Sequence, residues 1–341
     1  MIKLYDEKMN YIQAIISFKN LQIVEELNNG YKTCKFSVPY SIGHLKEEQK
    51  VEINNYLYVI KEVNMESNTM YDVYCNPYYG SLARKVMTNN VFTGSLTSIM
   101  AQLLTNTDWK FVEEQPISGI YSISLHNRTI MQAIKSIKGL FGIDIFYDTK
   151  KKEIHAWNKR GEYKSAFFLT TKNLSECKVQ SNTYDLITRL YPIGKDSITI
   201  AAANNNSPFI ECNDYCEDTI SGFYVESSIE SPLDLLNVAK LKLKEVSRPH
   251  TTYSIKLTQF DTDLSVGDSI KIIDDIKGVQ ATLRINKIVY YPFHNDKSYI
   301  EVGDKMVSFK DIYNSFEEAQ EIVNGNFLNG FTLLNKEYTE L

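Results

Sequence analysis

The sequence predicts an α+β protein that is mostly β and multi-domain, with two small antiparallel β-barrel-like domains and an inserted helix–strand module. Near both ends of the chain, apolar and polar residues alternate with a period of two, which is typical of strands with one wet face. Short amphipathic helices with capping residues separate these stretches, and 341 residues suffice for two or three domains. We expect residues 1–90 plus 166–230 to form the first barrel domain, 91–165 the inserted α+β domain, 231–306 a helix plus the second barrel domain, and 307–341 a C-terminal helix and connector.

The first ninety residues are typical of antiparallel strands. Segments 21–27 and 34–38 flank the turn Asn28-Asn29-Gly30, a sequence that favours a tight hairpin. Further strands are expected over 51–63 and 71–75.

The inserted module begins with a short helix over 96–103 and a strand over 109–112. Thr129 and Gln132 have the spacing of a capping box, and Gly139 suits the C-terminal cap of the helix that follows. A hairpin is then predicted from 143–147 and 153–157, with Lys150-Lys151-Lys152 as its solvated turn and His155 as a strand residue.

A third helix is predicted after Ser231, which can cap it, with Pro232 in its first turn and Arg248-Pro249 at its end. Its apolar residues recur on one face. These are Leu236, Ala239, Leu243 and Val246.

Short strands follow this helix, separated by turns such as Val266-Gly267-Asp268. In one of them the apolar phase slips between Ile285 and Ile288, which predicts a bulge near Asn286-Lys287, because a one-residue slip would otherwise reverse the strand's faces. A last helix is expected from Ser308.

The two ends of the chain share a local pattern. Segment 58–63 followed by 71–73 is similar to segment 283–288 followed by 299–301. This similarity fits an internal duplication of one strand arrangement, but two unrelated amphipathic strand pairs would also look alike.

Composition argues against several classes of function. The formal net charge is −5 with scattered lysines, which does not favour a general nucleic-acid-binding surface. The 23 tyrosines suit sheet faces and contact surfaces. There is no apolar run of bilayer length and no signal-peptide pattern, so we expect synthesis in the cytoplasm and no membrane span.

The cysteines do not suggest a disulfide framework, because they are five in number and widely spaced. Cys212 and Cys216 lack a second ligand pair, so thiols are favoured over a zinc site. The five are Cys34, Cys75, Cys177, Cys212 and Cys216.

No motif for catalysis stands out. The sequence has no zinc-peptidase motif, nucleophile elbow, P-loop or dinucleotide-binding fingerprint. We interpret Asp261 with Asp263, and Asp274-Asp275, as turn formers, with calcium binding as the alternative. We therefore predict no catalytic, cofactor-binding or metal-binding residues, and no cofactor. The histidines fall in separate segments, at His44, His126, His155, His250 and His294.

Three segments taken together resemble the minor tail proteins of bacteriophages and prophages, the prophage tail endopeptidase or tail-associated hub family. The first is the hairpin Glu26–Tyr31 running into Val38-Pro39, and the second is the central stretch Thr188–Asp196. The third is the helix from Ser231, followed by Arg248-Pro249, Leu264–Asp268 and Val302-Gly303-Asp304.

The resemblance implies the hub fold of phage baseplates and tail tips, in which three subunits with two barrel-like domains each form a ring of pseudo-sixfold symmetry. It implies a structural protein of a phage, prophage or tailocin, located in the virion tail at the tip or baseplate. The implied partners are two further copies in a homotrimer, the tail tube or distal tail protein, the tape measure protein, and a tip, spike or receptor-binding protein. DNA would only pass through the channel, and acidic residues lining it would repel the phosphates.

Two other functions remain open at this point. The chain could be a tail-associated cell-wall-degrading enzyme such as an endopeptidase, or an adhesin that binds cell-wall carbohydrate. No catalytic residue of the family transfers to a position in this chain, so we predict that it is not an enzyme.

Overall fold

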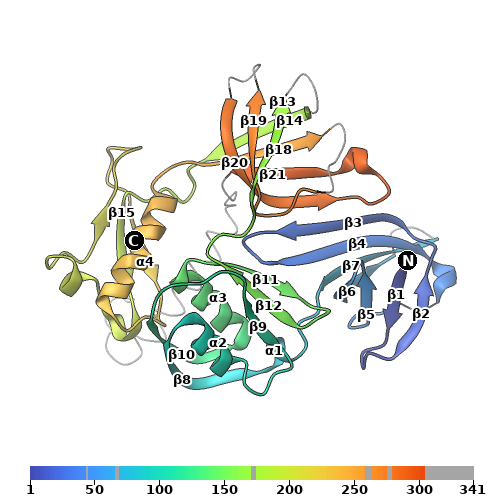
Figure 1. Ribbon diagram of the computed structural model, residues 1–341, viewed down its shortest axis with the longest axis horizontal. Helices are drawn as coiled ribbons and strands as arrows, with labels where there is room; N and C mark the ends of the chain where they lie inside the picture. Colours follow the sequence, from blue (N-terminus) through green and yellow to red (C-terminus); the bar gives the residue numbers. More distant parts are fainter. Residues whose placement is uncertain (44, 66–68, 170–173, 258–262, 275–278, 304–341) are drawn as a thin grey trace, which may run out of the picture.

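The computed structural model describes residues 1–303 except 44, 66–68, 170–173, 258–262 and 275–278 (Figure 1). The helix expected from Ser308 and the connector over 307–341 lie outside the described residues.

The N-terminal part of the chain forms a rolled antiparallel sheet with the order β3-β4-β7-β6-β5-β1-β2. The predicted hairpin is confirmed as β3 and β4, and its inward residues Phe36 and Val38 are buried with Val51 and Ile60. The strands are β1 (Ile2–Tyr5), β2 (Tyr11–Ile15), β3 (Lys19–Glu26), β4 (Tyr31–Pro39), β5 (Lys50–Ile53), β6 (Tyr56–Asn64) and β7 (Met70–Pro77).

The C-terminal part forms a second rolled sheet with the order β14-β18-β21-β20-β19-β13. Strand β14 falls in the segment 166–230 that we expected to complete the first sheet, and β13 crosses the expected boundary between the inserted domain and that segment, so the expected domains are wrong for both strands. Cys177 of β14 pairs with Ile255 and is buried in the C-terminal core, which accounts for the placement. The strands are β13 (Tyr163–Leu169), β14 (Leu174–Asn182), β18 (His250–Leu257), β19 (Ser269–Asp274), β20 (Val279–Tyr290) and β21 (Tyr299–Gly303).

The two rolled sheets are joined edge to edge. Strand β3 pairs with β20, with Lys287 opposite Glu26, so that a single sheet of 13 strands runs through both parts (Figure 1). The mostly β, antiparallel class is therefore confirmed, but no closed barrel is found among the described residues. The N-terminal sheet does not close into a barrel because β3, the strand at one end of it, pairs with β20 and not with β2.

The internal similarity seen in the sequence is matched by the topology. Two sets of five strands, β3-β4-β7-β6-β5 and β14-β18-β21-β20-β19, are arranged alike, and we call each set a copy. Counted along the chain, the strands of each copy lie side by side in the order first, second, fifth, fourth, third, and all their pairings are antiparallel. Each copy has a bulge at the same aligned position, after Ile60 in β6 and after Ile285 in β20. The bulge predicted near Asn286-Lys287 is thus confirmed, and the first copy carries its counterpart.

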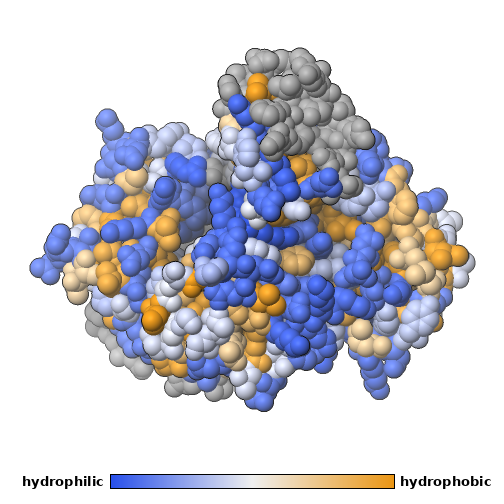
Figure 2. Space-filling view, viewed as in Figure 1, coloured by the Kyte–Doolittle hydropathy of each residue, from blue (hydrophilic) through white to orange (hydrophobic). Residues whose placement is uncertain are grey.

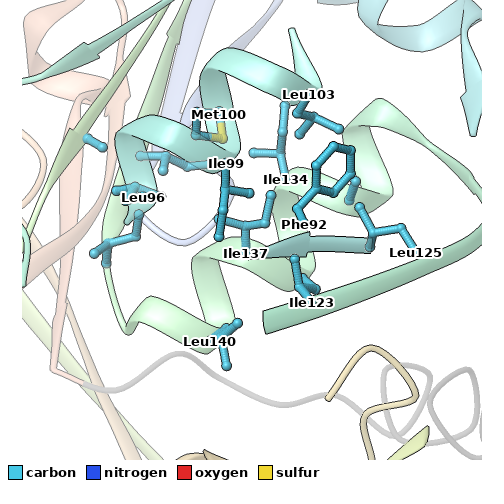
Figure 3. Packing of buried hydrophobic residues seen from close by; sticks show 14 of the residues in the cluster. Phe92, Leu96, Ile99, Met100, Leu103, Ile123, Leu125, Ile134, Ile137 and Leu140 are labelled. Carbon is cyan, nitrogen blue, oxygen red and sulfur yellow. The ribbon is translucent and has the colours of Figure 1, made fainter. Parts of the chain in front are cut away.

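The inserted module packs helices α2 (Leu96–Leu103) and α3 (Ile130–Phe141) against an antiparallel pair of strands, β8 (Val86–Gly94) and β10 (Tyr121–Thr129), around the largest core (Figure 3). Ile99 and Met100 of α2 face Ile134 and Ile137 of α3, and Phe92 lies beside them. A three-stranded sheet, β11-β12-β9, completes the module. Its elements are α1 (Ser81–Arg84), β8 (Val86–Gly94), α2 (Leu96–Leu103), β9 (Lys110–Glu113), β10 (Tyr121–Thr129), α3 (Ile130–Phe141), β11 (Asp144–Asp148) and β12 (Glu153–Trp157).

The predicted capping box at the start of α3 is confirmed, since Thr129 and Gln132 bond each other's backbone N–H groups. The predicted C-terminal cap is wrong by three residues. Gly139 lies inside the last turn, and Gly142 is the cap, because it has the left-handed φ of 63° and donates its N–H to the Gly139 carbonyl.

A smaller lobe holds the remaining helix, capped by Ser231 as predicted. Its buried side packs against a three-stranded sheet through Leu190, Ala239 and Leu243. The three strands of this sheet also fall in the segment 166–230, so the expectation that this segment completes the first sheet is wrong for them too. The lobe consists of β15 (Arg189–Ile193), β16 (Ile210–Glu211), β17 (Ser221–Val225) and α4 (Pro232–Val246). Short 3-10 turns occur at η1 (Tyr40–Ile42), η2 (Lys195–Ser197), η3 (Ala201–Ala203) and η4 (Asn295–Lys297).

Candidate assembly surfaces

One edge of the sheet of 13 strands is β2, which pairs only with β1 among the described strands. Tyr11 and Ile12 are exposed on it, and Ile16 just beyond it is 82% exposed. No charged residue occurs from Met9 to Phe18. Hydrophobic residues gather at the end of the molecule where β1 and β2 lie (Figures 1 and 2). Soluble proteins normally protect such an edge with charge, proline or a covering segment, so this edge is suited to pairing with another chain.

A second surface lies on the small lobe. The ring of Tyr191 contacts Phe209 and Phe223 at centroid distances of 5.4 and 5.6 Å, and Phe223 is 70% exposed. Arg189 lies over the Phe209 ring at 4.5 Å and is held by Glu211, with Nε and Nη2 each 2.6 Å from one carboxylate oxygen. Aromatic and arginine side chains in this arrangement are typical of contact surfaces. We call these five residues the aromatic patch.

The seam between the two sheets carries an ion-pair network on its outer face. Lys287 lies 3.6 Å from Glu26 across the seam and 3.4 Å from Glu301 on β21. Burial lowers the pKa of Lys287, but the two carboxylates outweigh burial, so the pKa of Lys287 lies above its ordinary value. The seam is therefore stabilised by charge as well as by backbone pairing.

The inserted module meets the C-terminal sheet through a backbone contact of two glycines. Gly161 and Gly267 both have left-handed φ values, and a Cβ on Gly267 would lie 2.5 Å from the Arg160 carbonyl oxygen. Beside them, Asp268 is buried and accepts from the backbone N–H of Glu162 at 2.9 Å and of Ser265 at 2.9 Å. The Val266-Gly267-Asp268 turn that the sequence suggested is thus also the contact point between two parts of the chain.

The lysine turn and the cysteines have the structural roles that the sequence predicts. The Lys150-Lys151-Lys152 turn is confirmed between β11 and β12, with the N–H groups of Lys150 and Lys151 donated to Asp148. Cys34 and Cys75 lie opposite each other on β4 and β7, where burial and the neighbouring thiol raise the pKa of Cys34. All five cysteines are free.

Among the residues whose side chains the structure describes, His155, His250 and His294 lie in different strands or turns. His250 is buried next to Asp185, and His294 lies in an exposed turn. His155 is within reach of Glu114 and Glu153, which sequence spacing did not suggest because Glu114 comes from another strand. His44, Asp261 and Asp275 lie outside the described residues.

This chain is similar to known proteins in part of its sequence and in its fold. Residues 162–313 match the family described as prophage endopeptidase tail, over slightly less than half of the chain. No curated protein matches the sequence.

Solved structures are similar over nearly the whole chain. Prophage tail protein gp18 from Listeria monocytogenes has a TM-score of 0.65 at 16% identity, covering 94% of this chain and 99% of gp18. The 43 kDa tail protein of prophage MuSo2 from Shewanella oneidensis has a TM-score of 0.65 at 10% identity, covering 89% and 98%.

The type VI secretion component c3393 of E. coli, described as similar to the T4 tail proteins gp27 and gp5, has a TM-score of 0.50 at 10% identity, covering 91% of this chain and 77% of c3393. Identities this low show the fold alone.

The fold is that of phage and prophage tail proteins. Residues 162–313 match the prophage endopeptidase tail family, so the resemblance to prophage tail proteins predicted from the sequence is confirmed. The matched region contains the central stretch Thr188–Asp196 and the whole of the third resembling block, and it leaves out the opening hairpin. None of the helices in the described part of the chain is long and apolar enough to cross a membrane.

Proposed function

We propose that this protein is a baseplate hub or tail-tip subunit. In this proposal three copies form a ring in the virion tail that joins the tail tube or distal tail protein to the tip or spike, next to the tape measure protein. DNA passes through the central channel without being bound.

The observation that carries the proposal is the repeated strand arrangement. Two sheets of the same order lie side by side in one chain and are joined by the pairing of β3 with β20. A trimer of such chains presents six similar sheets, which matches the symmetry of a hexameric tube. The outer strands of the sheet supply the surfaces through which neighbouring copies associate.

The β2 edge is the surface that we assign to contact between copies. It combines unpaired backbone groups with exposed apolar side chains, and these are the two features that edge pairing requires. The inserted module lies outside the ring in this arrangement.

Light scattering coupled to size-exclusion chromatography tests the proposal on the purified chain, alone and mixed with the distal tail protein. We expect a trimer in at least one of the two samples. Ile12→Lys should abolish it, while Val91→Lys, which places the same charge on an exposed strand of the inserted module, should leave it intact. A chain that stays monomeric in both samples would contradict the proposal.

As part of this proposal, the chain has a structural role and is not an enzyme. The family name includes an endopeptidase, but the described residues show no nucleophile paired with a histidine base, and the fold matches are to tail and secretion components. Clearing of Gram-positive peptidoglycan by the purified chain, lost on substitution of one carboxylate or cysteine, would overturn it.

The aromatic patch favours one second candidate, binding of cell-wall carbohydrate. Exposed aromatic rings next to a paired arginine and carboxylate can stack on a sugar ring and bond its hydroxyl groups. Sedimentation with isolated cell walls tests it. Binding that disappears in Phe223→Ala would support an adhesin, and no binding by the wild-type chain would exclude it.

A further inference from the structure

We propose that Asp148, Glu153 and His155 form a binding site for a divalent transition-metal ion such as Zn²⁺, with Glu114 holding the histidine ring in place. The site lies on the three-stranded sheet of the inserted module. It is separate from the surfaces to which we assign assembly.

The sheet brings the three proposed ligands together from two neighbouring strands. Asp148 at the end of β11 lies directly opposite Glu153 at the start of β12, and His155 lies two residues further along the same strand. Alternate residues of a strand share a face, so Glu153 and His155 point the same way. One ligand atom from each of the three lies within 4.8 Å of the other two.

The histidine has a carboxylate at each ring nitrogen. Its Nδ1 is 2.6 Å from Glu114 Oε1, and its Nε2 is 3.4 Å from Glu153 Oε2. A neutral imidazole has one N–H and one lone pair, while ionised carboxylates only accept. When Nδ1–H is donated to Glu114, the Nε2 lone pair faces the Glu153 oxygen, and a cation between them removes this repulsion.

A metal ion fits this arrangement as well as a proton does. Ligands at about 2.0–2.1 Å from a tetrahedral zinc ion lie about 3.4 Å from one another, and that is the Nε2–Oε2 separation. Donation of the other ring N–H to a carboxylate is the usual outer-shell arrangement of a metal-binding histidine. Asp148 adds a third ligand, and its Oδ1 is held by the N–H groups of Lys150 and Lys151.

Three lysines lie in the turn next to the proposed site, and two of them are paired with other residues. Lys150 is bonded to Glu52, and Lys152 is bonded to Asp108, so both are engaged away from the cluster. Lys151 is 3.8 Å from Asp148 Oδ2 and 66% exposed, which makes it the one lysine of this turn that competes with a metal ion.

The ligand set selects the kind of ion. A nitrogen ligand favours zinc and its first-row neighbours over magnesium and calcium, which prefer oxygen alone. Bound metal would tie β9, β11 and β12 together, and the ring of Trp157, stacked on His155 at 5.9 Å, would report on it.

Isothermal titration of the metal-stripped full chain with ZnCl₂ tests the site, with tryptophan fluorescence as a second readout. We expect one saturable site, and a melting temperature that rises with zinc. His155→Gln should weaken binding at least about tenfold, as should Glu114→Gln through loss of ring orientation. Lys151→Ala should strengthen it, and His294→Gln, a histidine remote in sequence, should leave it unchanged.

Asp148→Asn keeps an oxygen that can accept the turn N–H groups and provides a ligand test that does not depend on His155. If the wild-type chain shows no saturable zinc binding below millimolar concentration, the proposal fails. Equal zinc affinity in His155→Gln and wild type would also overturn it, because the metal would then be bound elsewhere.

Discussion

Gly267 and Glu52 show how single residues connect distant parts of this chain. Gly267 permits the backbone of the inserted module to touch the C-terminal sheet. Glu52, 5% exposed, accepts hydrogen bonds from Lys3 and Tyr5 of β1 and from Lys150 of the module's hairpin turn. The sequence indicated a turn at Gly267, but nothing in the pattern around Glu52 identified its partners, because they depend on the tertiary arrangement.

Gly267→Ala should destabilise the protein, because the new Cβ meets a backbone carbonyl and the φ of 99° disfavours any side chain. We expect a loss of about 2 kcal/mol or more in the free energy of unfolding, measured by urea denaturation. Gly139→Ala is the matched control. It lies in α3 with nothing within 4 Å of the added methyl group, and it should stabilise by about 0.5–1 kcal/mol. Equal effects of the two substitutions would contradict the contact described.

Glu52→Gln should lower the free energy of unfolding at pH 7 by about 2 kcal/mol, because two lysines lose a buried charged partner. Glu176→Gln, which removes an exposed ion pair with Lys178, should change it by less than about 0.5 kcal/mol. Urea denaturation measures both, and equal losses in the two variants would show that Glu52 is not the connection we describe.

The pH dependence follows from the same residue. Burial alone raises the pKa of Glu52, but hydrogen bonds from Lys150, Lys3 and Tyr5 outweigh burial and bring the pKa below its ordinary value of 4.5. Its contribution is therefore complete above pH 4.5 and is lost as the pH falls through the lowered pKa. Urea titrations between pH 3 and 6 should show less acid destabilisation in Glu52→Gln than in wild type.

At the level of elements, the sequence predicted local structure better than it predicted the partners of each strand. The β3–β4 hairpin, the capped starts of α3 and α4, and the bulge in β20 follow from turn residues, caps and periodicity, which act over short distances. The placement of β13 and β14 did not follow, because strand pairing over long distances leaves no signal in a single sequence. For the same reason the joining of β3 to β20, which keeps the first sheet from closing, was not foreseen.

Deleting Asn286 tests the bulge. Ile285, Lys287 and Ile288 would then alternate regularly opposite β21, so the deletion removes the bend while keeping the pairing. The Asn286 carbonyl accepts from the Leu27 N–H at 2.8 Å, and its side chain donates to the Gly303 carbonyl. Losing both bonds should cost about 2 kcal/mol in urea denaturation. Deleting Asn205 from an exposed turn is the control, and a similar cost there would show that the bend is unimportant.

For the whole molecule, the proposed threefold assembly depends on the two similar sheets in each chain. Their common strand order and equivalent bulges make a threefold assembly with six similar positions geometrically simple. The sequence suggested this repetition from two short segments, and the structure extends it to five strands in each copy. The contacts between neighbouring chains form only in the assembly.

Cryo-electron microscopy of the chain bound to its distal tail or tube protein is the most direct test of this arrangement. We predict three copies around a channel, with the N-terminal and C-terminal sheets alternating as six similar positions and the β2 edge in contact with the next copy. A complex with one copy per tube ring, or a trimer whose two sheets occupy unrelated positions, would contradict the account.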